Sequence, residues 1–226
     1  MLYVKNLEKS YYTGKIQYPV LKGISFQVAK GEFVAVMGPS GSGKSTLLNC
    51  ISCYIPFDKG GITLGGQNIA ALDEIQLSKV RNEKLGFVFQ DFMLLDGLTI
   101  RENILIPRII KEDVGKDALK RADKLLSLFG IEHIKNKYPA DVSGGERQRT
   151  AVARSLINNP LLLLADEPTG NLDSENSREI MELLRYSNKT YHQTVIVITH
   201  DENIALQADR ILALEDGRII RDEVIR

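Results

Sequence analysis

Short apolar runs alternate along the chain with longer segments in which polar and apolar residues mix. Phe33–Met37, Leu161–Ala165 and Val195–Thr199 are nearly continuous apolar runs, which is typical of strands that are covered on both faces of a parallel sheet. Chemically distinctive residues follow each run, namely a glycine-rich loop, an acidic pair and a histidine. Because ligands bind at the carboxyl edge of open α/β sheets, the pattern predicts an α/β fold with its functional site at that edge.

The N-terminal part of the chain has a different pattern. Tyr3–Lys9, Leu21–Val28 and Gly61–Ile69 are short segments bounded by turn-forming residues. Segments of this kind predict strands rather than helices. We therefore expect an antiparallel β patch beside the mostly parallel main sheet.

Mixed polar and apolar segments predict helices. One should cover Ser45–Ser52, after the glycine-rich loop, and residues from about 91 to 136 are mostly helical in pattern. The apolar spacing of Lys116–Phe129 fits one face of a helix that ends at Gly130. We expect a single domain over residues 1–226, with a helical subdomain of about 91–149 inserted between core segments 1–90 and 150–226.

The charge balance limits the possible partners. Lys plus Arg and Asp plus Glu both number 29, so no overall field favours an anionic polymer, and we expect no nucleic-acid partner. No apolar stretch approaches the length that crosses a bilayer, and the first residues lack the features of a signal peptide. Association with a membrane would therefore have to come through a partner.

The two cysteines, Cys50 and Cys53, form a C-x-x-C motif. A zinc site would need two further ligands at suitable spacing, and none is evident. Because the pair falls at the end of the helix predicted after the glycine-rich loop, we expect two buried free thiols, which fits a cytosolic setting.

The segment from Gly38 to Ser45 matches G-x-x-x-x-G-K-S between a predicted strand and a predicted helix. Glycines let successive backbone N–H groups point at phosphate oxygens, and the helix N-terminus adds to this attraction. Lys44 should reach the β- and γ-phosphates, and the Ser45 hydroxyl should ligate Mg²⁺. The expected phosphate-binding residues are Gly38, Ser40, Gly41, Ser42, Gly43, Lys44, Ser45 and Thr46.

An acidic pair, Asp166 and Glu167, follows the apolar run Leu161–Ala165. Acidic pairs often cap helices, but Pro168 argues against a helix that begins there and leaves both carboxylates available. We expect Asp166 to hold Mg²⁺, directly or through water, and Glu167 to be the general base that polarises the attacking water. His200, at the end of another central strand, is placed to contact the γ-phosphate and orient the water.

The stretch Ser143-Gly144-Gly145-Glu146 has two compatible interpretations. S-x-x-E is a capping box, which would begin a helix that runs to about Asn158. A helix N-terminus with two glycines and a serine hydroxyl is also an anion site. A second γ-phosphate binder in one chain makes sense if it serves a nucleotide that is held by another copy.

Together these motifs resemble the nucleotide-binding subunit of an ATP-binding cassette (ABC) transporter, and the resemblance spans essentially the whole chain. Ser143–Gln148 resembles the signature sequence of that family, which is far more specific than the phosphate loop alone. The resemblance implies a P-loop NTPase (RecA-like) core, ATP hydrolysis, and ATP and Mg²⁺ as cofactors.

Further residues carry roles only through this resemblance. Gln90 resembles the glutamine that ligates magnesium and senses the membrane partner, and Gly170–Asp173 resembles the loop that links the two sites of a dimer, with Asp173 at its end. Tyr11 resembles the aromatic residue that stacks on adenine, although the adjacent Tyr12 is an alternative. The chain has no N-K-x-D guanine-recognition motif, which is consistent with adenine.

The resemblance implies that two copies pair head to tail and sandwich two ATP molecules. Each ATP would lie between the phosphate loop of one copy and the signature of the other. Closure on ATP and opening after hydrolysis would drive an integral membrane permease, with the chain peripheral on the cytoplasmic face of the cell membrane.

Three segments narrow the branch of the family. Gly86–Leu95, Leu98–Ile104 and Ala165–Asp173 resemble the group that serves lipoprotein release, macrolide efflux and antimicrobial-peptide resistance, with a weak preference for the antimicrobial-peptide type. Two alternatives stay open for four apolar residues, which either line a groove for the permease or belong to the core of the helical subdomain. These residues are Leu94, Leu95, Leu98 and Ile100.

Three other functions compete with this interpretation. A soluble ABC ATPase acting on DNA or ribosomes would carry a long coiled coil or two cassettes, and the chain has neither. An importer ATPase often adds a C-terminal regulatory domain, whereas the chain ends about two dozen residues after His200. A regulatory ABC ATPase of the cell-division type stays open, because the membrane partner decides it.

Overall fold

The computed structural model describes residues 1–226 and contains two sheets. The larger sheet has the strand order β10-β9-β3-β8-β7-β6, and all of its strands are parallel except β10. Its strands are β3 (Phe33–Met37), β6 (Leu85–Val88), β7 (Leu162–Asp166), β8 (Thr194–Thr199), β9 (Arg210–Glu215) and β10 (Arg218–Val224). The predicted fold class, a mostly parallel α/β sheet with an antiparallel patch, is confirmed.

The apolar runs form strands because both faces of this sheet are covered. In β3, Phe33 and Ala35 belong to a hydrophobic cluster on one face of the sheet, whereas Val34 and Val36 belong to a second cluster on the opposite face. Every residue of β8 is buried. An amphipathic pattern would expose one face, so the continuous apolar runs are required by the three-layer architecture.

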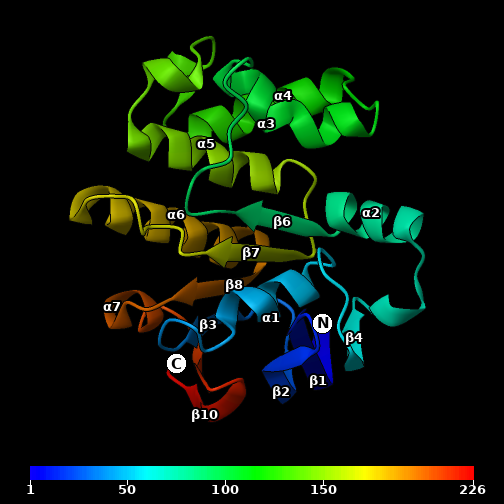
Figure 1. The fold of residues 1–226 in the computed structure, drawn as a ribbon. Coiled ribbons are helices and arrows are strands. Elements are labelled where there is room, and N and C mark those ends of the chain that lie inside the picture. Colours follow the sequence, from blue (N-terminus) through cyan, green and yellow to red (C-terminus); the bar gives the residue numbers. More distant parts are fainter.

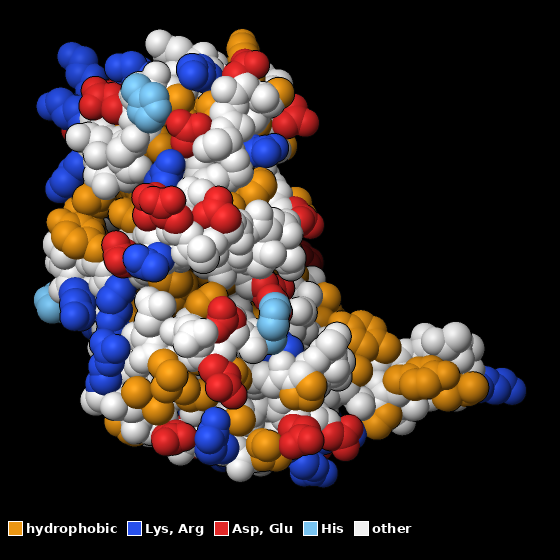
Figure 2. All heavy atoms as spheres, turned by 90° about the vertical axis from the view of Figure 1, so that its left-hand side faces the viewer, with side chains coloured by type: hydrophobic (Ala, Val, Ile, Leu, Met, Phe, Trp, Pro, Cys, Tyr) orange, Lys and Arg blue, Asp and Glu red, His pale blue; other side chains and the backbone are white.

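The smaller sheet is antiparallel, with the strand order β2-β1-β4-β5. Its strands are β1 (Leu2–Thr13), β2 (Ile16–Val28), β4 (Lys59–Leu64) and β5 (Gln67–Asn68). The first two are longer than predicted, because beyond the sheet they continue as a two-stranded hairpin that pairs Thr13 with Ile16. In Figure 2 this hairpin projects from the lower half of the molecule as an arm with an apolar surface and a basic tip.

The prediction of short strands with turns is confirmed over Gly61–Ile69, where β4 ends at Leu64 and β5 covers Gln67–Asn68. Gly65 and Gly66 have φ values of 56° and 82°, and this left-handed backbone turns the chain between β4 and β5. Ile69 then begins a short 3₁₀ turn, Ile69–Ala71. Two consecutive glycines were the signal for the turn.

Helices cover both faces of the larger sheet, and α3, α4 and α5 lie together at the top of Figure 1. The helices are α1 (Lys44–Ile51), α2 (Glu74–Glu83), α3 (Ile100–Ile110), α4 (Lys116–Leu128), α5 (Gly144–Leu156), α6 (Ser174–Tyr191) and α7 (Glu202–Ala205). Two further 3₁₀ turns are Glu132–Ile134 and Pro139–Asp141. None of these helices has both the length and the apolar content that a membrane span requires.

The helix predicted to begin at Ser143 begins there as α5, and α4 ends before Gly130 as the pattern predicts. The segment between β6 and α3 is not helical, although the sequence from residue 91 onward is mostly helical in pattern. Asn103 explains how this loop is held. Its fully buried side chain accepts a hydrogen bond from the backbone N–H of Leu95 and donates to the carbonyls of Leu95, Leu98 and Thr99.

Both cysteines are buried free thiols, as predicted. Burial raises the pKa of the Cys50 thiol to about 12 and that of the Cys53 thiol to about 11. Since the thiolate is the nucleophile, neither group is activated for redox chemistry.

The reaction of the thiols with iodoacetamide at pH 8 tests this assignment. In the folded chain we expect labelling at least about 100-fold slower than in urea, because almost no thiolate is present at that pH. Quenched samples analysed by mass spectrometry give the rate for each cysteine. Equal rates in the folded and unfolded chain would contradict the buried assignment.

Candidate functional site

The glycine-rich loop joins β3 to α1 in a conformation that depends on glycine. Gly41 and Gly43 have φ values of 80° and 103°, which other residues rarely adopt. At Gly38, an added Cβ would lie 2.1 Å from the carbonyl oxygen of Leu214. No side chain caps the N-terminus of α1, so its N–H groups are available to an anion.

Lys44 is folded back over this loop. Its ammonium donates hydrogen bonds to the carbonyl oxygens of Gly38 (2.7 Å) and Pro39 (2.9 Å). Only 8% of Lys44 is exposed. The cation is therefore held beside the phosphate-binding backbone and has no carboxylate partner.

A hollow of about 700 Å³ lies over the loop and brings together residues from three motifs. Its lining residues are Val20, Ser40, Gly41, Gly43, Lys44, Ser45, Thr46, Glu167 and His200. Two residues of the predicted phosphate loop lie beneath it instead. Gly38 is packed against β9, and Ser42 is buried with no hydrogen-bond partner for its hydroxyl.

The acidic pair lies at the end of β7. Glu167 has a φ of 46° and donates its N–H to the carbonyl of Ile198 (3.0 Å). This left-handed conformation directs its carboxylate to His200, whose Nδ1 lies 2.7 Å from Glu167 Oε2. Burial and the neighbouring negative charge of Glu167 raise the pKa of Asp166, while Ser45 and Lys44 oppose that rise. Asp166 therefore interacts with Glu167 and with Ser45 and Lys44 of the phosphate loop.

Gln90 lies just beyond the end of β6, and its side chain contacts the loop that follows the acidic pair. Its amide donates to Asn171 Oδ1 at 3.2 Å. Gln148, which is fully buried, donates to the carbonyls of Phe89 and Pro168 and so ties the ends of β6 and β7 together. Sequence reasoning placed Gln148 in the signature stretch but missed this structural role.

Ser143 caps α5 in a reciprocal capping box. Its backbone N–H and its hydroxyl donate to Glu146 Oε2 at 2.8 and 2.9 Å, and the Glu146 N–H donates back to the hydroxyl. The hydrogen bond from the Ser143 backbone is the main cause of the lowered pKa of Glu146. At Gly145 an added Cβ would lie 1.9 Å from Asn176 Oδ1, so a larger residue there would require the Asn176 side chain to move.

The structure keeps this capped helix end apart from the hollow. None of the residues from Ser143 to Gln148, which include Gly144 and Gly145, lines the hollow. Asp173 does not line it either, because its carboxylate caps α6 by accepting from the N–H and side-chain amide of Asn176 (2.9 and 2.8 Å). These hydrogen bonds lower the pKa of Asp173.

The two tyrosine candidates lie on opposite faces of the hairpin, since neighbouring residues of a strand point in opposite directions. Tyr11 shares a face with Lys9, whose ammonium lies 5.7 Å from the centre of the Tyr11 ring. Lys9 pairs with Leu21, which contacts the loop at Gly43. The face of Tyr11 is therefore the one that continues toward the phosphate loop, although neither tyrosine lines the hollow.

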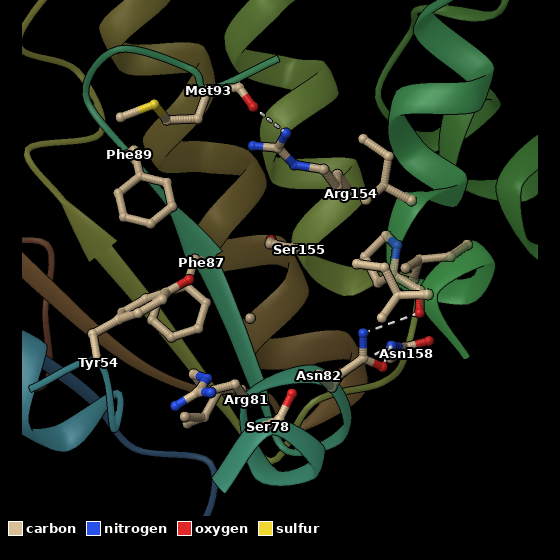
Figure 3. Close-up of a pocket in the computed structure, with 16 residues that line it drawn as sticks. Tyr54, Ser78, Arg81, Asn82, Phe87, Phe89, Met93, Arg154, Ser155 and Asn158 are labelled. Carbon is tan, nitrogen blue, oxygen red and sulfur yellow. Dashed lines mark hydrogen bonds between the residues drawn. The ribbon is translucent and has the colours of Figure 1, made fainter. Parts of the chain in front are cut away.

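A second cavity, of about 350 Å³, lies between α2, β6, α3 and α5 (Figure 3). Its apolar wall includes the rings of Tyr54, Phe87 and Phe89, with successive ring centres 5.2 and 5.8 Å apart. Arg154 closes one side by donating to the carbonyls of Phe92 and Met93, and burial lowers its pKa to about 10.

This cavity, called the groove below, is not lined by Leu94, Leu95, Leu98 or Ile100. Ile100 is fully buried and Leu94 packs against the hydrophobic cluster, so both belong to the core. Sequence reasoning missed the residues that do line the groove, because α2 was not predicted. The only sequence signal was the capping box of Asp73 and Gln76 that begins α2.

Comparison with known proteins places this geometry in a family. The sequence profile described as ABC transporter matches residues 21–170. The ABC transporter ATP-binding protein YxdL of Bacillus subtilis is 45% identical over 98% of this chain and 86% of its own length. The macrolide export ATP-binding/permease protein MacB of Shigella flexneri is 43% identical over 98% of this chain, which spans only 34% of MacB.

The structural comparison agrees. The chain superposes with a TM-score of 0.92 on a dimeric structure of the ATP-binding cassette MJ0796 bound to ADP and Pi in a post-hydrolysis state, at 42% sequence identity. That alignment covers 100% of this chain and 99% of the other. MJ0796 comes from Methanocaldococcus jannaschii. With its phosphate loop, acidic pair and capped signature helix arranged on a matching fold, this chain is an ATP-binding cassette ATPase of the ABC transporter family.

Proposed function

We propose that two copies of this chain enclose two ATP molecules, hydrolyse them with Mg²⁺, and drive a membrane permease. The observation that carries the proposal is that the N-termini of α1, at the phosphate loop, and α5, at Ser143, do not line a common hollow, although both types of helix end attract anions. A single chain offers no use for the second end. The dimeric structures of MJ0796 support an arrangement in which it serves the partner's nucleotide.

The residues present fit Mg²⁺ and a triphosphate. Mg²⁺ takes oxygen ligands and is usually held by one or two protein groups together with phosphates, and Ser45, Asp166 and Gln90 supply hydroxyl, carboxylate and amide oxygens. Burial and the negative charge of Glu167 raise the pKa of Asp166, and Ser45 and Lys44 oppose that rise. When bound, the ion would neutralise charge on the phosphates, and Lys44 would turn from its carbonyl partners to the β- and γ-phosphates.

Glu167 is the proposed general base. It accepts a proton from the attacking water as the water oxygen bonds to the γ-phosphorus, while the bond from that phosphorus to the bridging oxygen breaks and ADP leaves with this oxygen. His200 Nδ1 lies 2.7 Å from the Glu167 carboxylate, and His200 would contact the γ-phosphate of a bound nucleotide. Ser143, Gly144, Gly145 and Glu146 of the second copy complete the site, with Asp173 at the contact between copies. Tyr11 stacks on adenine, because it lies on the hairpin face that continues toward the phosphate loop.

The apolar groove in Figure 3 is the proposed contact with the permease. It lies directly beside Gln90, since Phe89 lines the groove and precedes Gln90 in the chain. A permease seated there would hold the chain at the cytoplasmic face of the membrane. MacB is named a macrolide export ATP-binding/permease protein, which supports an export-type permease as the partner, and YxdL is named an ABC transporter ATP-binding protein, which supports transport rather than nucleic-acid binding.

Glu167→Gln tests the base. We expect kcat for ATP hydrolysis to fall by about 10²–10⁴-fold, as for loss of a general base, while ATP still binds and a dimer accumulates. Phosphate release and gel filtration with ATP measure the two effects. Hydrolysis at the rate of the unchanged protein would contradict the assignment of the base.

Complementation between two inactive variants tests the shared site. Ser143→Arg and Lys44→Ala should each abolish hydrolysis, whereas an equimolar mixture should recover activity. A mixed dimer regains one complete site, made from the intact phosphate loop of one copy and the intact signature of the other. If the mixture stays inactive while mixed dimers form, the signature acts within its own chain.

Two matched surface changes test the permease contact. Ile110 lines the groove and is 67% exposed, whereas Ile220 of β10 lies outside it and is 61% exposed. Ile110→Glu should abolish co-purification of a membrane-spanning protein from detergent-extracted native membranes, without changing ATP binding, and Ile220→Glu should preserve co-purification. Equal behaviour of the two variants would remove the groove from the proposal.

A further inference from the structure

Asn171 lies in the loop between the acidic pair and α6. Its side-chain Nδ2 donates to the Gln90 carbonyl at 3.2 Å and to Asp91 Oδ1 at 2.9 Å. Its Oδ1 accepts from Gln90 Nε2 at 3.2 Å. One amide thus contacts both the backbone and the side chain of Gln90.

This network sets the direction of both amides. The Gln90 carbonyl and the Asp91 carboxylate only accept hydrogen bonds, so they require the NH₂ group of Asn171 on their side. The Asn171 oxygen must then face the Gln90 side chain. An oxygen accepts only from the NH₂ end of an amide, and the Gln90 Oε1 is therefore left free.

A free Oε1 matters because of the ligand proposed for Gln90. Mg²⁺ binds oxygen atoms, whereas the NH₂ end of an amide carries positive partial charge and repels it. An unrestrained glutamine exchanges its two ends by rotation about one bond. We propose that Asn171 is a positioning residue that fixes the Gln90 amide with Oε1 toward the metal, an inference that rests on the function proposed for Gln90.

The surrounding residues place the two amides for this contact. Gln148 ties the backbone of Phe89, directly before Gln90, to that of Pro168, three residues before Asn171. Gly170 leaves space for the Gln90 side chain, since an added Cβ would lie 3.0 Å from Gln90 Nε2. The loop after β7 therefore lies against the side chain it orients.

The test compares ATP affinity with and without Mg²⁺ in the Glu167→Gln background, where ATP is not turned over. Asn171→Leu keeps the side-chain size but removes both hydrogen-bonding ends. We expect it to lower the Mg²⁺-dependent gain in ATP affinity about fivefold, equivalent to about 1 kcal/mol, and to leave the Kd for ATP in EDTA unchanged. Asp91→Ala, which removes one acceptor of the network, should give a smaller loss in the same direction.

A double-mutant cycle separates positioning from a merely structural role. In a chain that also carries Gln90→Ala, Asn171→Leu should have no further effect on the Mg²⁺-dependent gain. An equal loss of affinity in EDTA, or the same loss in the Gln90→Ala chain, would overturn the proposal. If Gln90→Ala lowers the gain but Asn171→Leu does not, only the positioning role fails. If Gln90→Ala itself has no effect, the metal role of Gln90 fails with it.

Discussion

Parallel pairing of four strands is the constraint on which the whole site depends. Met37 of β3 lies opposite Thr199 of β8, Ile198 of β8 opposite Asp166 of β7, and Ala165 of β7 opposite Val88 of β6. The phosphate loop, His200, the acidic pair and Gln90 follow these positions at one edge. A shift of one residue in any pair would turn alternate side chains to the other face, so the buried apolar pattern of the strands also fixes the geometry of the site.

Polar side chains from the helices then hold the loops that leave this edge. Gln148 joins the ends of β6 and β7, Asn103 holds the loop before α3, and Arg154 holds the carbonyls of Phe92 and Met93. All three come from helices of the group above the sheet. The segment after β6 also lines the groove, through Phe89 and Met93. Movement of these helices would therefore act on the segment that begins at Gln90.

The site also contains features that work against stability. Glu167 adopts a left-handed backbone conformation, which costs free energy for a residue with a side chain. Burial beside a second carboxylate raises the pKa of Asp166. The Lys44 ammonium is mostly buried and hydrogen-bonds only to neutral carbonyls of its own loop, without a carboxylate to balance its charge. A bound metal ion would offset the negative charge at Asp166, and bound phosphate would give Lys44 an anionic partner.

The sequence by itself determined the fold class, the phosphate loop, the acidic pair and the capped helix at Ser143, because each depends on local spacing and on the apolar runs beside it. It did not reveal α2 or the groove, since α2 buries only Val80 and carries almost no apolar pattern. Only the tertiary structure decided which tyrosine lies on the face toward the phosphate loop and that Asn171 meets Gln90. Contacts between residues that lie 81 positions apart depend on the order and register of the strands, which no local pattern contains.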